Sequence, residues 1–198
     1  MSIIDEFFAD VDQQWPAAPA ATKIRLAIIG SSALMLQTRY ERGTKDSDVF
    51  ETVDLAPATK AALLRVAGKD TELHRRWRLY IDIVGNGIPF LPHGPLWHPV
   101  AAVNGKLRRI ELVALDVVDV VVSKLKRFHA NDQADVDAMI ARGLVPHARL
   151  VARFRSAVDD FIGDARAAEL PGYIANLHRV ERDMLGVGET EIELPSWI

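Results

Sequence analysis

The stretch Ile28-Ile29-Gly30-Ser31-Ser32, followed fourteen residues later by Asp46-Ser47-Asp48-Val49, decides how this chain folds. The apolar run from Leu26 to Ile29 predicts a short buried strand, which ends at Gly30. A helical pattern begins directly after the two serines. A strand that leads through a small-residue turn into a helix N-terminus presents backbone N–H groups and the positive end of the helix dipole. This stretch therefore predicts an anion site.

Asp46 and Asp48 open a second predicted strand beside that turn. Residues two apart in a strand point to the same face, with roughly 7 Å between their Cα atoms, so the two carboxylates can converge on one point. Two aligned carboxylates repel each other unless a cation lies between them. Hard divalent cations that keep substrate phosphates as ligands suit such a pair. We therefore expect Mg²⁺ or Mn²⁺ at these two residues.

Each part of this pattern also has a common structural explanation. Gly-Ser turns follow many strands that bind no phosphate, and an Asp-x-Asp sequence is usually a solvated loop or a helix cap. The order of the elements is more specific than either part. Strand, Gly-Ser, helix, the basic loop Arg42-Gly43-Thr44-Lys45 and an Asp-x-Asp that enters an apolar strand follow one another. This order favours the anion and metal interpretation.

A third aspartate, Asp82, interrupts the apolar run Leu79–Val84, whose Ile, Val and Tyr residues predict a strand. An aspartate inside an apolar strand is costly unless it is hydrogen-bonded or binds a ligand. The alternative is an aspartate at an exposed strand end before Gly85-Asn86-Gly87. Asp82 is thus the candidate for a third carboxylate of the site.

Composition limits the class of protein. The chain has 198 residues, of which 49% are hydrophobic and 26% charged, as expected for one globular domain or one with a helical appendage. It has no cysteine, which excludes disulfides and thiolate metal sites and favours a cytoplasmic protein. No apolar run approaches 18 residues, and the acidic N-terminal segment is not typical of a secretory signal.

The net charge of −3 argues against a general nucleic-acid binder, although local basic patches remain candidates. Three short runs supply them: Arg75-Arg76-Trp77-Arg78, Lys106-Leu107-Arg108-Arg109 and Lys124-Leu125-Lys126-Arg127. Such runs are more often solvated faces than nucleic-acid contacts.

Residue patterns predict the remaining elements. Helices are expected over 2–15, 31–38, 58–67, 134–142, 147–162 and 165–185, the last with a break at Pro171-Gly172, and strands over 24–29, 46–52 and 79–84. A Pro/Ala linker is expected over 16–21. Asn104-Gly105 lies between two apolar segments, 97–103 and 106–113, and predicts a hairpin with a type I′ turn.

Residues 85–99 contain four prolines and predict an irregular loop whose aromatic and histidine side chains either stack a base or pin the loop to the core, the second being favoured. Asp116 is expected to cap the helix that follows, which is apolar nearly all round and therefore buried. Lys124 leaves the apolar face near the end of this helix. It either reaches sideways into a cleft or extends its amine to water.

These residues resemble the nucleotidyltransferase superfamily of polymerase-β-like proteins, whose signature is an apolar residue, Gly, Gly or Ser, a spacer and Asp-x-Asp. Within it, Gly30–Leu34 together with Arg42–Val49 are most similar to the AbiEii-type toxins and their uncharacterised relatives. A second motif of that group is an apolar helix that ends in Lys-Leu and continues through Arg to Asp-x-x-Asp. It resembles the positions Lys124-Leu125, Arg127, Asp132 and Asp135. The two motifs together cover roughly residues 24–137.

The resemblance implies an α+β fold: a small mixed β-sheet with flanking helices, plus a C-terminal helical segment. Residues 1–130 would form the catalytic core, and residues 131–198 a helical region packed on it. The implied activity is metal-dependent transfer of a nucleotidyl group from a nucleoside triphosphate to an acceptor.

In this interpretation Asp46, Asp48 and Asp82 are catalytic and hold Mg²⁺ or Mn²⁺, and Asp82 could also deprotonate the acceptor hydroxyl. The nucleotide would be bound by Gly30, Ser31, Ser32, Arg42, Thr44, Lys45, Lys124 and Arg127. The resemblance suggests RNA, tRNA included, as the acceptor and a cognate antitoxin protein as a partner. The lack of a long apolar run predicts no membrane association.

The sequence departs from the toxin pattern in having Ser47 where that group has an apolar residue, and in its length. Two alternatives therefore stay open. One is a non-catalytic regulator of the same fold that binds a nucleotide or a partner. The other is a helical interaction module in residues 134–198 with the N-terminal part as its scaffold.

Overall fold

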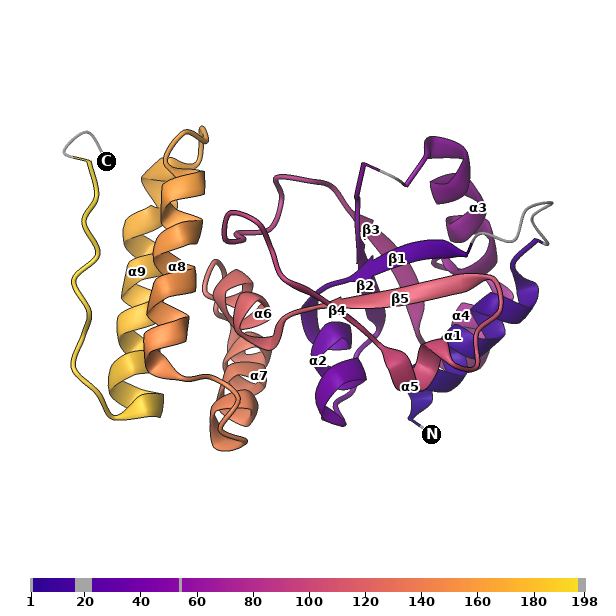
Figure 1. Ribbon diagram of the computed structural model, residues 1–198, viewed down its shortest axis with the longest axis horizontal. Coiled ribbons are helices and arrows are strands. Elements are labelled where there is room, and N and C mark those ends of the chain that lie inside the picture. The colour runs from indigo at the N-terminus through magenta and orange to yellow at the C-terminus, as the bar shows by residue number, and fades with distance from the viewer. Residues whose placement is uncertain (1, 17–22, 54, 196–198) are drawn as a thin grey trace. The chain divides into compact units, whose positions relative to one another are not determined.

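The computed structural model describes residues 2–16, 23–53 and 55–195, and most of the expected Pro/Ala linker lies outside them. The chain divides into two compact units (Figure 1). Residues 1–88 and 97–115 form the first unit, and residues 89–96 and 116–198 form the second. The architecture is the α+β fold that the sequence predicted, with a mixed sheet in the first unit and helices in the second.

The sheet of the first unit has five strands in the order β3-β2-β1-β5-β4 (Figure 1). These strands are β1 (Ile24–Ile28), β2 (Asp46–Phe50), β3 (Tyr80–Val84), β4 (Trp97–Pro99) and β5 (Ile110–Leu115). The pairs β1–β5 and β2–β3 are parallel, whereas β1–β2 and β4–β5 are antiparallel. Strands β1 and β5 lie in the middle, which is why both are almost continuously apolar.

Strand β2 alternates between the two faces of the sheet. Ser47 and Val49 are fully buried, whereas Asp46 and Asp48 are partly exposed. This period of two is what a strand with one covered face requires. The apolar side of β2 fixes its register, and this register turns the two carboxylates to the opposite face.

In the described part of the first unit, the sheet is accompanied by the helices α1 (Ile3–Gln14), α2 (Gly30–Thr38), α3 (Pro57–Ala67), α4 (Glu72–Trp77) and α5 (Ala101–Asn104). Helix α1 begins with a capping box between Ser2 and Asp5 and buries an apolar face that includes Phe7 and Phe8. The predicted helices over 2–15, 31–38 and 58–67 are confirmed to within a residue or two.

Asp12 ties α1 to the start of β5. Its carboxylate accepts hydrogen bonds from the backbone N–H groups of Arg108, Arg109 and Ile110 at 2.7–3.1 Å. The side chain is 6% exposed, so these three donors satisfy a charge that water hardly reaches.

Helix α4 was not predicted. It has six residues, and Thr71 caps it by accepting a hydrogen bond from the N–H of His74. Arg78 ends it in the left-handed conformation (φ 56°). A helix this short and polar shows no apolar periodicity. Its capping threonine is the only sequence signal that indicates the helix.

Strands β4 and β5 pair antiparallel as expected, but the predicted type I′ turn at Asn104-Gly105 is wrong. Asn104 ends the short helix α5, and Gly105 has a right-handed φ of −63°. The Asn104 amide instead exchanges two hydrogen bonds of 2.8 Å with the backbone of Leu112. The asparagine thus acts through its side chain and not through a left-handed backbone.

The second unit contains α6 (Val117–Lys124), α7 (Ala130–Ala141), α8 (His147–Phe161), the 3₁₀ turn η1 (Ala167–Glu169), α9 (Leu170–Arg179) and a π-helical turn η2 (Val180–Leu185). Asp116 caps α6 as predicted by accepting a hydrogen bond from Val118 N–H at 2.9 Å. Pro171 lies in the first turn of α9, so the predicted break at this residue is wrong. A proline in a first turn has no hydrogen bond to lose.

Phe90 pins the loop 89–96 inside the second unit. Its buried ring makes edge-to-face contacts with Phe154, Phe161 and Tyr173, with ring centroids 5.1–5.5 Å apart. The N–H of Leu96 also donates to the buried Asp119 carboxylate at 2.9 Å. The loop therefore packs on its own unit through Phe90, as the favoured alternative predicted.

The chain passes from the first unit to the second at 88/89, returns at 96/97 and passes over again at 115/116, so residues 116–130, which include α6, lie with the helical unit. The predicted boundary at residue 130, between a catalytic core and a helical region, stays a prediction. Within the residues that the structure describes, no helix has the length and apolar character needed to span a membrane.

Candidate functional site

The parallel pairing of β2 with β3 brings three predicted carboxylates to one face of the sheet. The register places Asp46 opposite Tyr80 and Asp48 opposite Asp82. Partners in adjacent strands point to the same side, and the strands lie about 4.8 Å apart. The intervening Ile81 is buried on the other face, which confirms the side on which the carboxylates lie.

Gly30 lies directly against Asp48. It has a left-handed φ of +64°, and a Cβ atom on it would come within 2.9 Å of Asp48 Oδ2. The N–H of Ile29 donates to the carbonyl of Asp48 at 2.9 Å, which extends the β1–β2 ladder up to the turn. The small-residue turn and the second aspartate of Asp-x-Asp therefore form one structural unit.

Helix α2 begins at this turn. Its N-cap residue, Ile29, offers no side-chain hydrogen bond to the first turn of the helix. Ser31 is half-buried, whereas Ser32 is 1% exposed and donates from its hydroxyl to the Asp46 carbonyl at 3.3 Å. Ser32 thus fastens α2 to β2, and the helix N-terminus opens beside the carboxylates.

The basic loop touches the same site. The Thr44 hydroxyl hydrogen-bonds to the Asp46 carbonyl at 3.0 Å and to its carboxylate Oδ1 at 3.2 Å, so it orients this side chain. Lys45 is exposed, and its carbonyl accepts from Tyr80 N–H at 3.2 Å. Arg42 is half-buried and donates from Nε to the Gly43 carbonyl at 3.4 Å.

Tyr80 belongs to the site and was missed by the sequence reasoning. Burial raises the pKa of its phenol, and the charges of Asp46, Asp82 and Asp48 raise it further. One hydroxyl therefore lies within the electrostatic influence of all three carboxylates, in agreement with the register of β2 and β3. Its position two residues before Asp82 in a strand was the signal that could have found it.

The carboxylates offer the hard oxygen donors that Mg²⁺ prefers. In the described part of the chain, however, no three His, Cys, Asp or Glu side chains are arranged as one metal site. Asp82 is exposed and turns Oδ1 back to the N–H of Ile83 at 2.9 Å. Mg²⁺ usually takes one or two carboxylates together with substrate phosphates and water. Asp46 and Asp48, beside the Gly30 turn, fit such a site.

Lys124 and Arg127 lie in the second unit. The Lys124 ammonium is buried and contacts Asp132 Oδ1 at 3.1 Å and Asp135 Oδ2 at 2.7 Å, whereas Arg127 is exposed. These contacts give Lys124 a structural role within the helical unit. A part for either residue in nucleotide binding stays a prediction.

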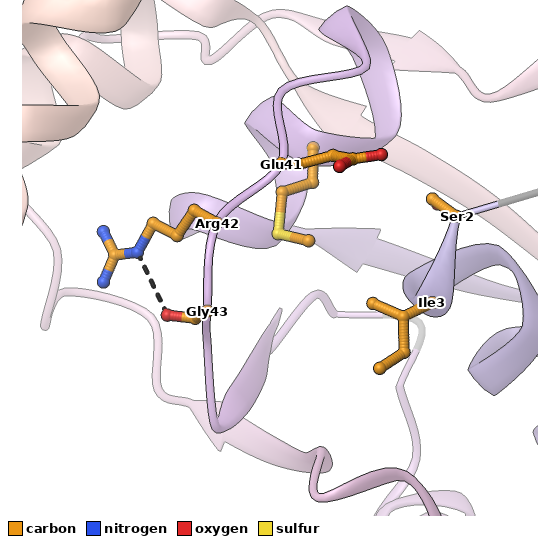
Figure 2. Close-up of a pocket in the computed structure, with 6 residues that line it drawn as sticks. Ser2, Ile3, Glu41, Arg42 and Gly43 are labelled. Carbon is orange, nitrogen blue, oxygen red and sulfur yellow. Dashed lines mark hydrogen bonds between the residues drawn. The ribbon is translucent and has the colours of Figure 1, made fainter.

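The first unit also contains a cavity of about 460 Å³ that was not predicted from the sequence (Figure 2). It is lined by Ser2, Ile3, Met35, Glu41, Arg42 and Gly43. None of the three aspartates lines it, but Thr44, which contacts Asp46, follows Gly43 directly.

Residues 6–170 match the model of a family described as "Nucleotidyltransferase of unknown function (DUF6036)". The match spans both sequence motifs and includes every carboxylate of the site. No curated protein and no solved structure matches the chain.

Proposed function

The chain belongs to this nucleotidyltransferase family, and we propose that it transfers a nucleotidyl group from a nucleoside triphosphate to an acceptor hydroxyl, with Mg²⁺ or Mn²⁺ held at Asp46 and Asp48. The observation that carries the proposal is the close approach of Gly30 to Asp48. Asp48 lies in β2, directly opposite Asp82 of β3. This arrangement joins an anion-binding turn to clustered carboxylates, which phosphoryl-transfer chemistry requires.

Each group of the site has a part in binding the donor. Gly30 lets the chain pass close to Asp48, and the N–H groups at the start of α2 would hold phosphate oxygens. The Thr44 hydroxyl keeps the Asp46 carboxylate oriented toward the ion. When bound, the divalent ions would neutralise the triphosphate and stabilise both the attacking and the leaving oxygen.

Asp82 is the proposed base. Its carboxylate is exposed at the edge of the sheet, where an acceptor can reach it. It would take the proton from the acceptor hydroxyl as the oxygen forms a bond to the α-phosphorus. The bond between the α-phosphorus and its bridging oxygen then breaks, and pyrophosphate leaves. Arg42 and Lys45 are the cations of the first unit that would neutralise the leaving group.

RNA is the proposed acceptor class. Exposed cations lie near the starts of β2 and β3. Lys45 directly precedes β2, and its carbonyl accepts a hydrogen bond from Tyr80, the first residue of β3. The exposed Arg78 lies two residues before Tyr80. Helix α4 adds Arg75 and Arg76, the latter paired with Asp10 at 2.9 Å. Such a basic edge beside the carboxylates suits a phosphate backbone despite the net negative charge. A toxin-like role with an antitoxin partner rests on the sequence resemblance alone.

A nucleotide-binding regulator without catalysis is the second candidate. The observation in its favour is Asp82, whose carboxylate is engaged by its own strand at Ile83 N–H and does not join the other two in one metal site. Such a protein would bind Mg²⁺ and a nucleotide but transfer nothing.

A titration with Mg²⁺ and each of the four nucleoside triphosphates, followed by thermal unfolding, tests the donor site. A ligand that binds only the folded state raises the midpoint in proportion to its saturation. We expect a metal-dependent rise that the double variant Asp46→Asn/Asp48→Asn abolishes. Transfer of a labelled nucleotide to RNA, lost in Asp82→Asn, then separates the enzyme from the regulator. No rise with any nucleotide at millimolar concentration would refute both.

A further inference from the structure

The face of the sheet that carries the aspartates continues beyond them toward the middle of the sheet. Phe50 lies in β2 two residues after Asp48, so both side chains are on the same face. Phe50 is in register with Ala27 of β1, and Ala27 is in register with Val113 of β5. Residues in register point to the same side, so the carboxylate face runs from β2 across β1 to β5.

Trp97 of β4 belongs to the same face. Val113 is in register with Pro99, and Trp97 lies two residues before Pro99 in the strand. The Trp97 ring contacts that of Phe50, with ring centroids 5.9 Å apart and planes inclined by 32°. Strands β1 and β5 lie between β2 and β4, a distance of roughly 14 Å at three strand spacings. The two side chains therefore extend toward each other across the intervening strands.

The aromatic pair covers the middle of the sheet and remains partly accessible itself. Ala27 and Val113, which lie between Phe50 and Trp97 on this face, are each 3% exposed. Phe50 and Trp97 are half-buried. Partly accessible aromatic rings are the groups on which proteins stack nucleobases. The face thus offers a stacking surface next to the carboxylates.

The order of residues along β2 gives a bound nucleotide its direction. The Ser32 hydroxyl, in the first turn of α2, donates to the Asp46 carbonyl, so the start of α2 lies at the Asp46 end of β2. Phe50 is the last residue of the strand. A triphosphate with its terminal phosphates at the start of α2 and its α-phosphate at Asp48 would extend its ribose and base toward Phe50. Asp82 lies on the other side of Asp48, in the edge strand β3, which leaves that side to the acceptor.

We propose that the rings of Phe50 and Trp97 bind the nucleobase of the donor nucleoside triphosphate by stacking. The inference rests on the proposed function, because it concerns the base of the same triphosphate. Every nucleobase has a π-face, so stacking holds any of the four bases and distinguishes a nucleotide from a triphosphate that has no base. An aromatic pair that only covered β1 and β5 would make no such distinction.

Titration calorimetry of the full chain in Mg²⁺ tests the proposal by comparing the four nucleoside triphosphates with ribose 5-triphosphate, which has no base. Phe50→Leu and Trp97→Leu each remove one ring, whereas Trp97→Phe keeps a ring at that position. The matched control is Trp77→Leu, at a half-buried tryptophan of the same unit whose indole N–H donates to Asp10 of α1 at 2.9 Å. The unliganded melting midpoint checks that each variant folds.

We expect the tightest-binding nucleotide to exceed ribose 5-triphosphate in affinity by at least about tenfold, as the stacking of one base allows. Phe50→Leu and Trp97→Leu should each remove most of this advantage and leave the binding of ribose 5-triphosphate unchanged. Trp97→Phe should keep the advantage but lose the quenching of tryptophan fluorescence by nucleotide, because the stacked base contacts the Trp97 indole. Trp77→Leu should bind all ligands as the wild type does.

The outcomes separate this proposal from the proposed function. Equal affinities for nucleotides and ribose 5-triphosphate, or an advantage that survives both leucine changes, overturn the stacking of the donor base and leave the proposed function standing. Leucine variants that bind nucleotide normally but no longer transfer it to RNA would place the acceptor on the rings, which also overturns the proposal.

The double variant Asp46→Asn/Asp48→Asn provides the converse test. Nucleotide binding that is independent of Mg²⁺, survives in this variant and is lost in Trp97→Leu would overturn the proposed function and keep the stacking surface. Binding of none of the ligands by the folded wild-type protein would overturn both.

Discussion

The Oδ2 atom of Asp48 lies 2.9 Å from the point that a Cβ atom on Gly30 would occupy. Real Cβ atoms essentially never approach a neighbour this closely, so only glycine fits beside this carboxylate. The same glycine has a φ of +64°, which other residues adopt only with strain. A larger residue at position 30 would therefore displace the Asp48 carboxylate.

Replacing Gly30 by alanine should abolish the Mg²⁺-dependent binding of nucleotide, because the Asp48 carboxylate must move. We also expect a loss of about 1–3 kcal/mol in the free energy of unfolding, from backbone strain and the clash. Urea denaturation and nucleotide titration measure the two effects. Gly163→Ala is the control, since nothing lies within 4 Å of a Cβ atom there, no left-handed φ is required and the residue lies in the second unit. Wild-type nucleotide binding in Gly30→Ala would contradict the assigned site.

Ser47→Ala should raise stability by up to about 1 kcal/mol. Ser47 is 0% exposed, and its Oγ has no hydrogen-bond partner in the described part of the chain. Removing a buried hydroxyl that is unsatisfied relieves its desolvation cost. Ser32→Ala is the matched control, because that buried hydroxyl does donate to the Asp46 carbonyl, and its loss should destabilise. Denaturant midpoints that fall in both variants would show that Ser47 has a partner.

Asp12→Ala should lower the free energy of unfolding by about 2–4 kcal/mol. The change leaves the N–H groups of Arg108, Arg109 and Ile110 without their acceptor and releases α1 from β5. Asp137→Ala, at an exposed position of α7, should change stability by less than about 0.5 kcal/mol. If the two changes have equal effects in urea denaturation, the three hydrogen bonds contribute nothing to the free energy of unfolding.

Lys124→Ala should destabilise the protein by about 3–5 kcal/mol, because it leaves the buried carboxylates of Asp132 and Asp135 without their cation. Arg127→Ala, at an exposed position in the same run, should be close to neutral for stability. If Lys124 also bound the nucleotide, the folded fraction of the variant would bind nucleoside triphosphate more weakly than wild type. A Lys124→Ala variant that is as stable as the wild type would show that Lys124 has no structural role.

Glu181 predicts a pH dependence of stability. Burial pushes the pKa of its carboxyl upward, but hydrogen bonds from His147 and Thr190 outweigh burial and hold the pKa below its ordinary value. A carboxyl with a lowered folded pKa contributes stability above its unfolded pKa of about 4.3, and this contribution disappears as pH falls through the folded pKa.

The difference in unfolding free energy between wild type and Glu181→Gln should therefore be full at pH 7 and shrink progressively below about pH 4.3. Urea denaturation at several pH values measures it. Glu193→Gln, at an exposed position of the C-terminal segment that runs beside α9 in Figure 1, is the control. A difference that stays constant down to pH 3 would mean that the Glu181 carboxyl keeps its ordinary pKa.

The sequence predicted the elements of the site because their signals are local. An apolar run, a glycine and the alternation around Ser47 and Val49 each lie within a few residues. Asp82 could be predicted as a candidate because an aspartate is conspicuous in an apolar strand, and the structure places it opposite Asp48.

The remainder depends on contacts between distant residues. The opposition of Asp48 and Asp82 follows from the parallel pairing of β2 and β3, which no local pattern encodes. Asn104-Gly105 looked like a type I′ turn, but the Asn104 amide bonds to Leu112 and holds a helical turn instead. The cavity has no sequence signature because Ile3 and Glu41 are brought together only by the packing of α1 beside α2.

The pairing of β1 with β5 has a consequence for how the protein is made. Ile24 is in register with Ile110, so 86 positions of chain separate the two partners at the centre of the sheet. A ribosome builds the chain from its N-terminus, at a rate of about 5–20 residues per second. During synthesis, the edge of β1 that pairs with β5 therefore stays unpaired for several seconds. The three aspartates of the candidate site are all synthesised before β5. The sheet is therefore completed only when Leu115 has emerged, and a chain that stops at residue 88 should fail to fold.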